Sequence, residues 1–224
     1  EAFCSGKSTF SYQFDQLAFD EGRYINALID YPKYKRQKQR VQKLFMETAF
    51  PLSIIRTNTD NGVLKIQPNF SQLYRIEVSD FNENKTTVVV PIDYSPLPPT
   101  IPTQITKTPY LVKAGKDSAF EKENMSVFFP AGTFYNDFYL DFDVKNKVMT
   151  VQDDDTAVHS NFIVSVKESG VDNPEKTFIA SISGKRLTYN ATKYKDNTFT
   201  AYTKNLGGFT LAKDTVAPRI SIGK

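Results

Sequence analysis

The side chains that most often perform chemistry in proteins are scarce in this chain. Its 224 residues include one cysteine, Cys4, and one histidine, His159. A single cysteine excludes an intrachain disulfide and a thiolate metal cluster, and a single histidine excludes every site that needs two imidazoles. Neither a Gly-rich phosphate loop nor a Gly-x-Ser-x-Gly nucleophile motif is present. Paired carboxylates stay open, because 25 acidic residues are scattered along the chain. Nothing marks any two of them, so we expect no catalytic residue, no cofactor and no metal.

The most pronounced charge cluster lies at residues 33–43, which hold six basic residues and no acidic one. One interpretation is a contact with an anionic polymer (cell-wall polymer, lipid headgroup or nucleic acid), with candidates Lys35, Arg36, Lys38 and Arg40. The interpretation that we favour is a solvated edge strand, whose basic side chains prevent edge-to-edge pairing. Few aromatic residues accompany the run, and the net charge of +3 is small. Both facts argue against a nucleic-acid partner.

Two further polar clusters carry a structural and a functional interpretation. The carboxylates of residues 153–155 could help to hold Ca²⁺, but their spacing differs from that of an EF-hand loop, so we expect a solvated turn. His159 precedes a predicted strand and is interpreted as a loop residue. In residues 80–85, the side chains of Asp80 and Asn84 are expected to fix a turn between two strands through hydrogen bonds to the backbone.

The dominant hydrophobic period is two, which indicates strands. Residues 138–144 alternate between apolar positions and the outward Asp141 and Asp143. Further alternating or Val-rich runs occupy residues 8–15, 73–79, 87–92, 162–166, 178–182, 187–191 and 198–203. Turn signals, such as Ser183-Gly184-Lys185, lie between these runs and at Gly207-Gly208. We expect inward rings at Phe138, Phe142, Phe162 and Phe199. Strands about every ten residues predict an all-β chain of antiparallel sandwiches.

Helical signal is limited to residues 20–29, where one short helix is expected to end before Pro32. Six of the twelve prolines fall in residues 91–109, and this stretch reads as a semi-rigid linker. We therefore predict an Ig-like sandwich at 1–92, a Pro-rich linker at 93–109 and a second sandwich at 110–213. Residues 214–224 are expected to begin a further, truncated module, and the chain is interpreted as a piece of a longer protein.

Several stretches, taken in order, resemble a known family. They are residues 10–15, 19–26, 29–31, 40–45, 74–84 (YRIEVSDFNEN), 134–142 and 208–218 (GFTLAKDTVAP). They are similar to the region that follows the catalytic domain in large bacterial lysostaphin-type murein zinc endopeptidases. In that family zinc is held by a His and an Asp near each other and by a His of a later His-x-His. Only His159 exists here, outside any such context, so the resemblance transfers no catalytic residue.

The resemblance implies an exported, cell-envelope protein whose sandwiches position, cover or anchor a peptidase domain. The expected function is a non-catalytic spacer or accessory module, with its own peptidase domain and cell-wall polymer as partners. A first alternative is a murein- or glycan-binding module that uses exposed tyrosines, with candidates Tyr34, Tyr139 and Tyr202. The absence of Trp argues against this alternative. A second alternative is an adhesin-like sandwich with a protein partner, which a contiguous exposed apolar patch would favour. The longest apolar-leaning run, residues 88–92, is far too short to span a membrane.

Overall fold

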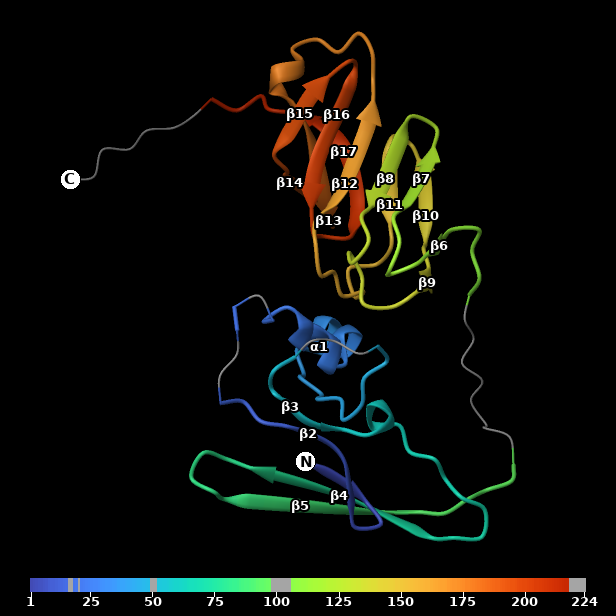
Figure 1. The fold of residues 1–224 in the computed structure, drawn as a ribbon. Helices are drawn as coiled ribbons and strands as arrows, with labels where there is room; N and C mark the ends of the chain where they lie inside the picture. The colour runs from blue at the N-terminus through green and yellow to red at the C-terminus, as the bar shows by residue number, and fades with distance from the viewer. Residues whose placement is uncertain (16–17, 20, 49–51, 98–105, 218–224) are drawn as a thin grey trace, which may run out of the picture. The chain divides into compact units, whose positions relative to one another are not determined.

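The chain divides into two compact units, residues 1–105 and 106–224, and the division falls inside the Pro-rich segment. The computed structural model, drawn in Figure 1, describes residues 1–15, 18–19, 21–48, 52–97 and 106–217. Antiparallel sheets dominate both units, which confirms the predicted all-β class. In the described part of the chain, no helix has the length and apolar character needed to cross a bilayer.

The first unit contains one five-stranded antiparallel sheet with the order β3-β2-β1-β4-β5. The strands are β1 (Ala2–Cys4), β2 (Lys7–Tyr12), β3 (Ile55–Asn58), β4 (Gln72–Ser79) and β5 (Lys85–Ile92). Between β2 and β3 lie a 3-10 helix, η1 (Tyr24–Leu28), and a short α-helix, α1 (Tyr31–Gln37); the 3-10 helix η2 (Asp60–Gly62) follows β3.

The core of this unit is small and lies on one face of the sheet. Ala2 and Phe10 on the sheet pack with Leu28, Met46, Leu52 and Ile54, all of them buried. The described residues therefore cover the sheet with loops and short helices. A second sheet, as the predicted Ig-like sandwich requires, is not formed by the described strands of this unit.

The helical prediction needs two corrections. Residues of the expected helix form η1, but a second helix, α1, follows it, and Pro32 lies in the first turn of α1. Proline is tolerated there because the first-turn N–H groups have no partner within a helix, so Pro32 begins a helix where we expected it to end one. Asp20, at the start of the predicted range, lies outside the described residues.

The second unit is a sandwich of two five-stranded antiparallel sheets with the orders β10-β11-β17-β13-β14 and β15-β16-β12-β8-β7. The first sheet contains β10 (Phe142–Lys145), β11 (Val148–Val151), β17 (Gly207–Lys213), β13 (Thr177–Ser183) and β14 (Arg186–Tyr189). The second contains β15 (Thr192–Lys195), β16 (Thr198–Thr203), β12 (Phe162–Lys167), β8 (Met125–Phe129) and β7 (Ser118–Lys122). A two-stranded sheet pairs β6 (Leu111–Val112) with β9 (Phe138–Tyr139), and a 3-10 helix, η3 (Pro174–Lys176), precedes β13.

Aromatic side chains fill the space between the two large sheets. Phe142, Phe162 and Phe199 are buried as predicted, and Phe138 is partly buried against the same core. The ring of Phe129 contacts those of Phe134 and Phe162 with centroids 5.0 and 5.2 Å apart. Such tilted and edge-on pairs are the favoured aromatic geometry, so this core fixes the spacing of the sheets.

Two-residue turns close the tightest hairpins of this unit. Asn146 and Lys147 join β10 to β11, and Asp196 and Asn197 join β15 to β16; all four have positive φ, as the right-handed strand twist requires. One turn prediction is wrong. Gly207 and Gly208 begin strand β17, and Gly208 pairs with Ile182 on β13. Because Gly208 has no side chain, the Ile182 side chain can lie against it.

Candidate functional site

The four predicted contact residues for a polyanion lie on and just after α1. Asp30 caps the helix by accepting a hydrogen bond from the Lys33 main-chain N–H at 3.0 Å, and Lys38 ends it with a left-handed conformation. Lys35 and Arg36 belong to the last turn, where positive charge interacts favourably with the helix dipole. The favoured interpretation of this run as an edge strand is therefore wrong, since a capped first turn and a left-handed end select a helix.

Two of the four cations gather on one aromatic ring. The Nζ atom of Lys38 lies 5.9 Å and the Cζ atom of Arg40 lies 5.6 Å from the centroid of the Tyr34 ring. The ring of Tyr31 is a further neighbour of Tyr34, with centroids 6.3 Å apart. Cation–π attraction holds the two charges close together. The structure thus brings Lys38 and Arg40 into one exposed group that sequence spacing alone did not define.

The second unit contains a groove with an apolar floor. Its volume is about 340 Å³, and its lining includes Met125, Val166, Val171 and Leu211. These residues belong to β8, β12, the segment after β12, and β17, so the groove opens between the two sheets of the sandwich.

The rim of this groove carries charges of both signs. Glu168 and Asp172 contribute carboxylates, and Lys147 and Lys213 contribute amines. Asn124 orders one side: its Nδ2 donates to the Lys167 carbonyl at 2.9 Å and to Glu168 Oε2 at 3.0 Å. The arrangement suits a ligand with an apolar body and charged ends. Its lining residues come from segments far apart in the chain, so no local sequence pattern predicted the groove.

Several carboxylates of the second unit are engaged in structural contacts. Asp143, predicted to face outward from its strand, accepts a hydrogen bond from Lys122 and lies 2.7 Å from Lys145 Nζ. These two hydrogen-bonded amines hold the pKa of Asp143 well below its usual range, and the same contact with Asp143 raises the pKa of Lys122. Asp117 and Asp137 accept from the main-chain N–H groups of Ala131 and Ala114.

The predicted turn is confirmed, with Asp80 bonding to the backbone as expected and the Asn84 side chain bonding to the Asp80 carboxylate instead. Asp80 Oδ1 accepts hydrogen bonds from the main-chain N–H groups of Asn82 and Asn84, each at 2.9 Å, and its Oδ2 accepts from Asn84 Nδ2 at 2.8 Å. The bonds from Asn84 and Asn82 favour the charged form and lower the pKa of Asp80. The carboxylate therefore locks the hairpin between β4 and β5.

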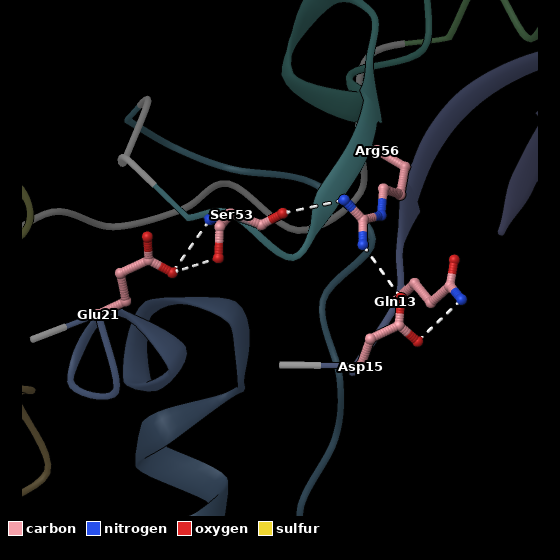
Figure 2. Close-up of polar contacts among 5 residues, drawn as sticks. All are labelled: Gln13, Asp15, Glu21, Ser53 and Arg56. Atoms are coloured by element: carbon pink, nitrogen blue, oxygen red, sulfur yellow. Dashed lines mark hydrogen bonds and ion pairs between the residues drawn. The ribbon is translucent and has the colours of Figure 1, made fainter. Parts of the chain in front are cut away.

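A polar network in the first unit, shown in Figure 2, was not singled out from the sequence. Glu21 Oε2 accepts from the hydroxyl of Ser53 at 2.7 Å and from its main-chain N–H at 3.1 Å, while Arg56 donates to Asp15 Oδ2 at 3.1 Å. Gln13 Nε2 donates to the other oxygen of Asp15 at 2.8 Å. The network ties the chain after β2 to the start of β3.

The remaining candidates lie in separate places. His159 donates its main-chain N–H to the Thr133 carbonyl, and its Nδ1 lies 3.3 Å from Tyr135 Oη. Residues 153–155 form the predicted turn, closed by the Thr156 N–H on the Asp153 carbonyl. Among the described residues, no group of three or more His, Cys, Asp or Glu side chains is arranged to hold a metal ion. Of the tyrosines considered for a sugar contact, Tyr34 lies on α1 in the first unit, and Tyr139 and Tyr202 lie on β9 and β16 in the second. Tyr202 is exposed, whereas Tyr34 and Tyr139 are half-buried.

A comparison with known protein families adds one finding. The sequence profile of a family described as a Zu5-like domain matches residues 109–214, which take in the whole run of strands from β6 to β17. No curated protein and no solved structure matches the chain. The second unit is thus similar to Zu5-like domains, and the first unit lies outside the matched residues.

Proposed function

We propose that this chain serves as a non-catalytic β-sheet module of an exported cell-envelope protein, where it positions or anchors a murein-cutting peptidase domain. The observation that supports a structural role is the use made of its carboxylates. Asp143 and Asp80 are held in their charged form, and Asp30, Asp117 and Asp137 fix main-chain turns or caps.

Acid catalysis calls for the opposite electrostatics. A general acid that works near neutral pH needs a raised pKa, which burial or a neighbouring negative charge supplies. Among the described residues, the two carboxylates with shifted pKa values are Asp143 and Asp80, and hydrogen-bond donors lower the pKa of both. They act as acceptors that rigidify strands and turns, which suits a module that presents a neighbouring domain.

A direct experiment joins a lysostaphin-type peptidase domain to the N-terminus of residues 1–224. We expect the fusion to cleave intact murein faster than the peptidase domain alone and to cleave a soluble cross-bridge peptide at the same rate. The isolated chain should cleave neither substrate. Cleavage by the isolated chain, or equal rates on intact murein with and without it, would refute the proposal.

A second candidate function rests on the groove of the sandwich. Its apolar floor and mixed-charge rim would suit a murein peptide, whose methyl groups and terminal charges match these features. Calorimetry with soluble murein fragments tests this function. Binding that weakens when Glu168 or Lys213 becomes Gln, and that is unchanged in Lys193→Gln on β15, would support it; absence of heat at millimolar fragment would end it.

A further inference from the structure

The outer edge of the first unit's sheet is formed by an exposed strand of unusual composition. Strand β5 is the last strand in the order β3-β2-β1-β4-β5, so one of its edges has no neighbour among the described strands. Figure 1 shows the β4–β5 hairpin reaching along the sheet as two long, paired arrows. Seven of the eight β5 residues are exposed. Long apolar edges of this kind pair readily with another strand.

The main-chain groups that β5 leaves unpaired follow from the register. On β4, the Leu73 carbonyl accepts from Ser5 N–H, and the main chain of Glu77 exchanges hydrogen bonds with Glu1. These odd-numbered β4 residues thus bond toward β1, so the alternation of an antiparallel ladder directs Tyr74 and Ile76 toward β5. Their partners on β5 are Val90 and Val88.

The other set of β5 residues therefore presents its backbone outward. Thr87 and Val89 pair with Glu77 and Arg75 in the register and offer both N–H and C=O to the free edge. Pro91 belongs to the same set and has no N–H to lose. The free edge is thus an intact ladder template at its centre.

Apolar side chains accompany this edge on both faces. Val88 and Val90 are 50% and 41% exposed on the face that continues the buried core, and Val78 beside them is 62% exposed. Val89 is 53% exposed on the opposite face. Leaving such neighbouring valines in water is unfavourable, and pairing with an apolar strand would cover part of them.

We infer that the occupant of this edge is a second copy of the same chain, joined antiparallel through β5 about a two-fold axis at Val88. In this register Thr87 lies opposite Val89 of the second copy, and the two exchange both main-chain hydrogen bonds. The symmetric pair does the same. Val88 lies opposite Val88 of the second copy, which makes the apolar face continuous across the axis.

The charges and the proline of β5 fit this register. Lys85 is the only charged residue of the strand, and it lies opposite Pro91 of the second copy. The Lys85 N–H can donate to that proline's carbonyl, and the Lys85 carbonyl, which meets no proline N–H, is left to water at the end of the joint. The two lysines stand at opposite ends of the joint, so like charges do not meet. The two-fold pairing occupies the free β5 edge of each copy. The contact therefore forms a closed dimer and does not continue into a fibre.

The affinity should be modest, because a single strand pair buries less surface than a standard protein interface. We expect a dissociation constant in the micromolar to millimolar range. Light scattering and sedimentation of the full chain, from about 1 µM to about 1 mM, should show the mass rising from 25.4 kDa toward twice that value. A monomer throughout this range overturns the inference.

Charge substitutions at the axis locate the contact. Val88→Lys places two lysines opposite each other and should raise the dissociation constant at least about tenfold, since apposed like charges oppose association. Val88→Glu should do the same. An equimolar mixture of the two variants should associate again as a heterodimer, which misfolded variants would not do. Val63→Lys, at a residue 57% exposed outside the strands, should self-associate as the original chain does.

The outcomes separate this contact from every other one. Self-association that Val88→Lys leaves unchanged places the interface elsewhere and overturns the inference. Failure of the mixed variants to associate also overturns it. The proposed accessory function does not depend on this result, because the fusion assay reads murein cleavage and not the oligomeric state.

Discussion

The two units use similar residue types but differ in how completely they cover their sheets. In the second unit two five-stranded sheets cover each other around a core of buried rings and aliphatic side chains. In the first unit one sheet meets a small core built from loops and short helices, and its β4–β5 hairpin extends beyond that core. A sheet that is covered on its inner face can act as a rigid body. A partly covered sheet keeps apolar surface available for another chain.

The largest expected effects come from the buried rings. Phe142→Ala should lower the free energy of unfolding of the second unit by about 3–5 kcal/mol, because it removes a ring packed against Tyr110 and Phe120 and leaves a cavity. Phe10→Ala should remove the protection of the first unit altogether, since its core is smaller. Hydrogen exchange in increasing urea, followed separately for peptides of each unit, measures both. A loss below about 1 kcal/mol for Phe142→Ala would contradict the two-sheet core.

A smaller effect is expected at a glycine that the first unit's loops require. Gly62 has a φ of +75°, and an added Cβ would lie 2.3 Å from the Leu44 carbonyl oxygen. Gly62→Ala should therefore destabilise this unit by about 2–3 kcal/mol. Gly6, with a φ of +82° and open space around it, is the matched control; Gly6→Ala should cost only about 1 kcal/mol, from backbone strain alone. Equal losses would show that the 44–62 packing is not needed.

The pH dependence of the two units should have the same sign but different causes. The pKa of Asp143 and that of Asp80 both lie below the ordinary value of 3.8 in the folded chain. Their contribution to stability is therefore complete above that value and is lost as the pH falls through the folded pKa. In Asp143→Asn, the stability of the second unit should fall less steeply as the pH is lowered below about 4. In Asp80→Asn, the same change is expected for the first unit. Thermal unfolding from pH 2 to 7 measures this; an unchanged acid limb in Asp143→Asn would exclude the Lys122 contact.

The smallest effect on stability is expected from the cations on and just after α1. Replacing Lys35, Arg36, Lys38 and Arg40 by Gln should lower the free energy of unfolding by about 1–2 kcal/mol, because the helix-dipole and cation–π contacts are lost. Retention of the chain on heparin should nevertheless fall, because α1 and the residues after it would lose their charge cluster. The matched control replaces four exposed cations of the second unit, Lys185, Arg186, Lys193 and Lys195. Equal losses of retention in the two variants would mean that net charge, and not the α1 cluster, governs binding.

Local pattern was sufficient for much of the second unit. Phe142, Val144 and Phe199 alternate with polar residues, and Phe162 begins an apolar run; a period of two places all four on the inner side of a strand. The Asp80 turn was equally predictable, because an Asp side chain can reach the N–H groups two and four residues later. Strand β8 (Met125–Phe129) was not identified, although its alternation of buried and half-buried residues is as regular.

The first unit was harder to predict, because its local sequence patterns fit more than one structure. Residues 33–43 carry a charge pattern that a strand edge and a helix surface both accept. Only the cap from Asp30, with Pro32 in the first turn, decides for the helix. The number of sheets could not be deduced either. An alternating strand pattern indicates that one face of the strand is buried, but it does not indicate whether a second sheet or loops and helices cover that face.

The sequence by itself determined the antiparallel β class, the inward phase of the main aromatic positions, the Asp80 turn and the scarcity of groups for nucleophilic or metal chemistry. These are properties of residue type and of spacing within a few residues. Only the tertiary structure decided that Lys38 and Arg40 meet on Tyr34, that a groove opens between the two sheets, and that β5 keeps a free apolar edge. Each of these depends on which segments become neighbours, and that is set by long-range packing, which no local period records.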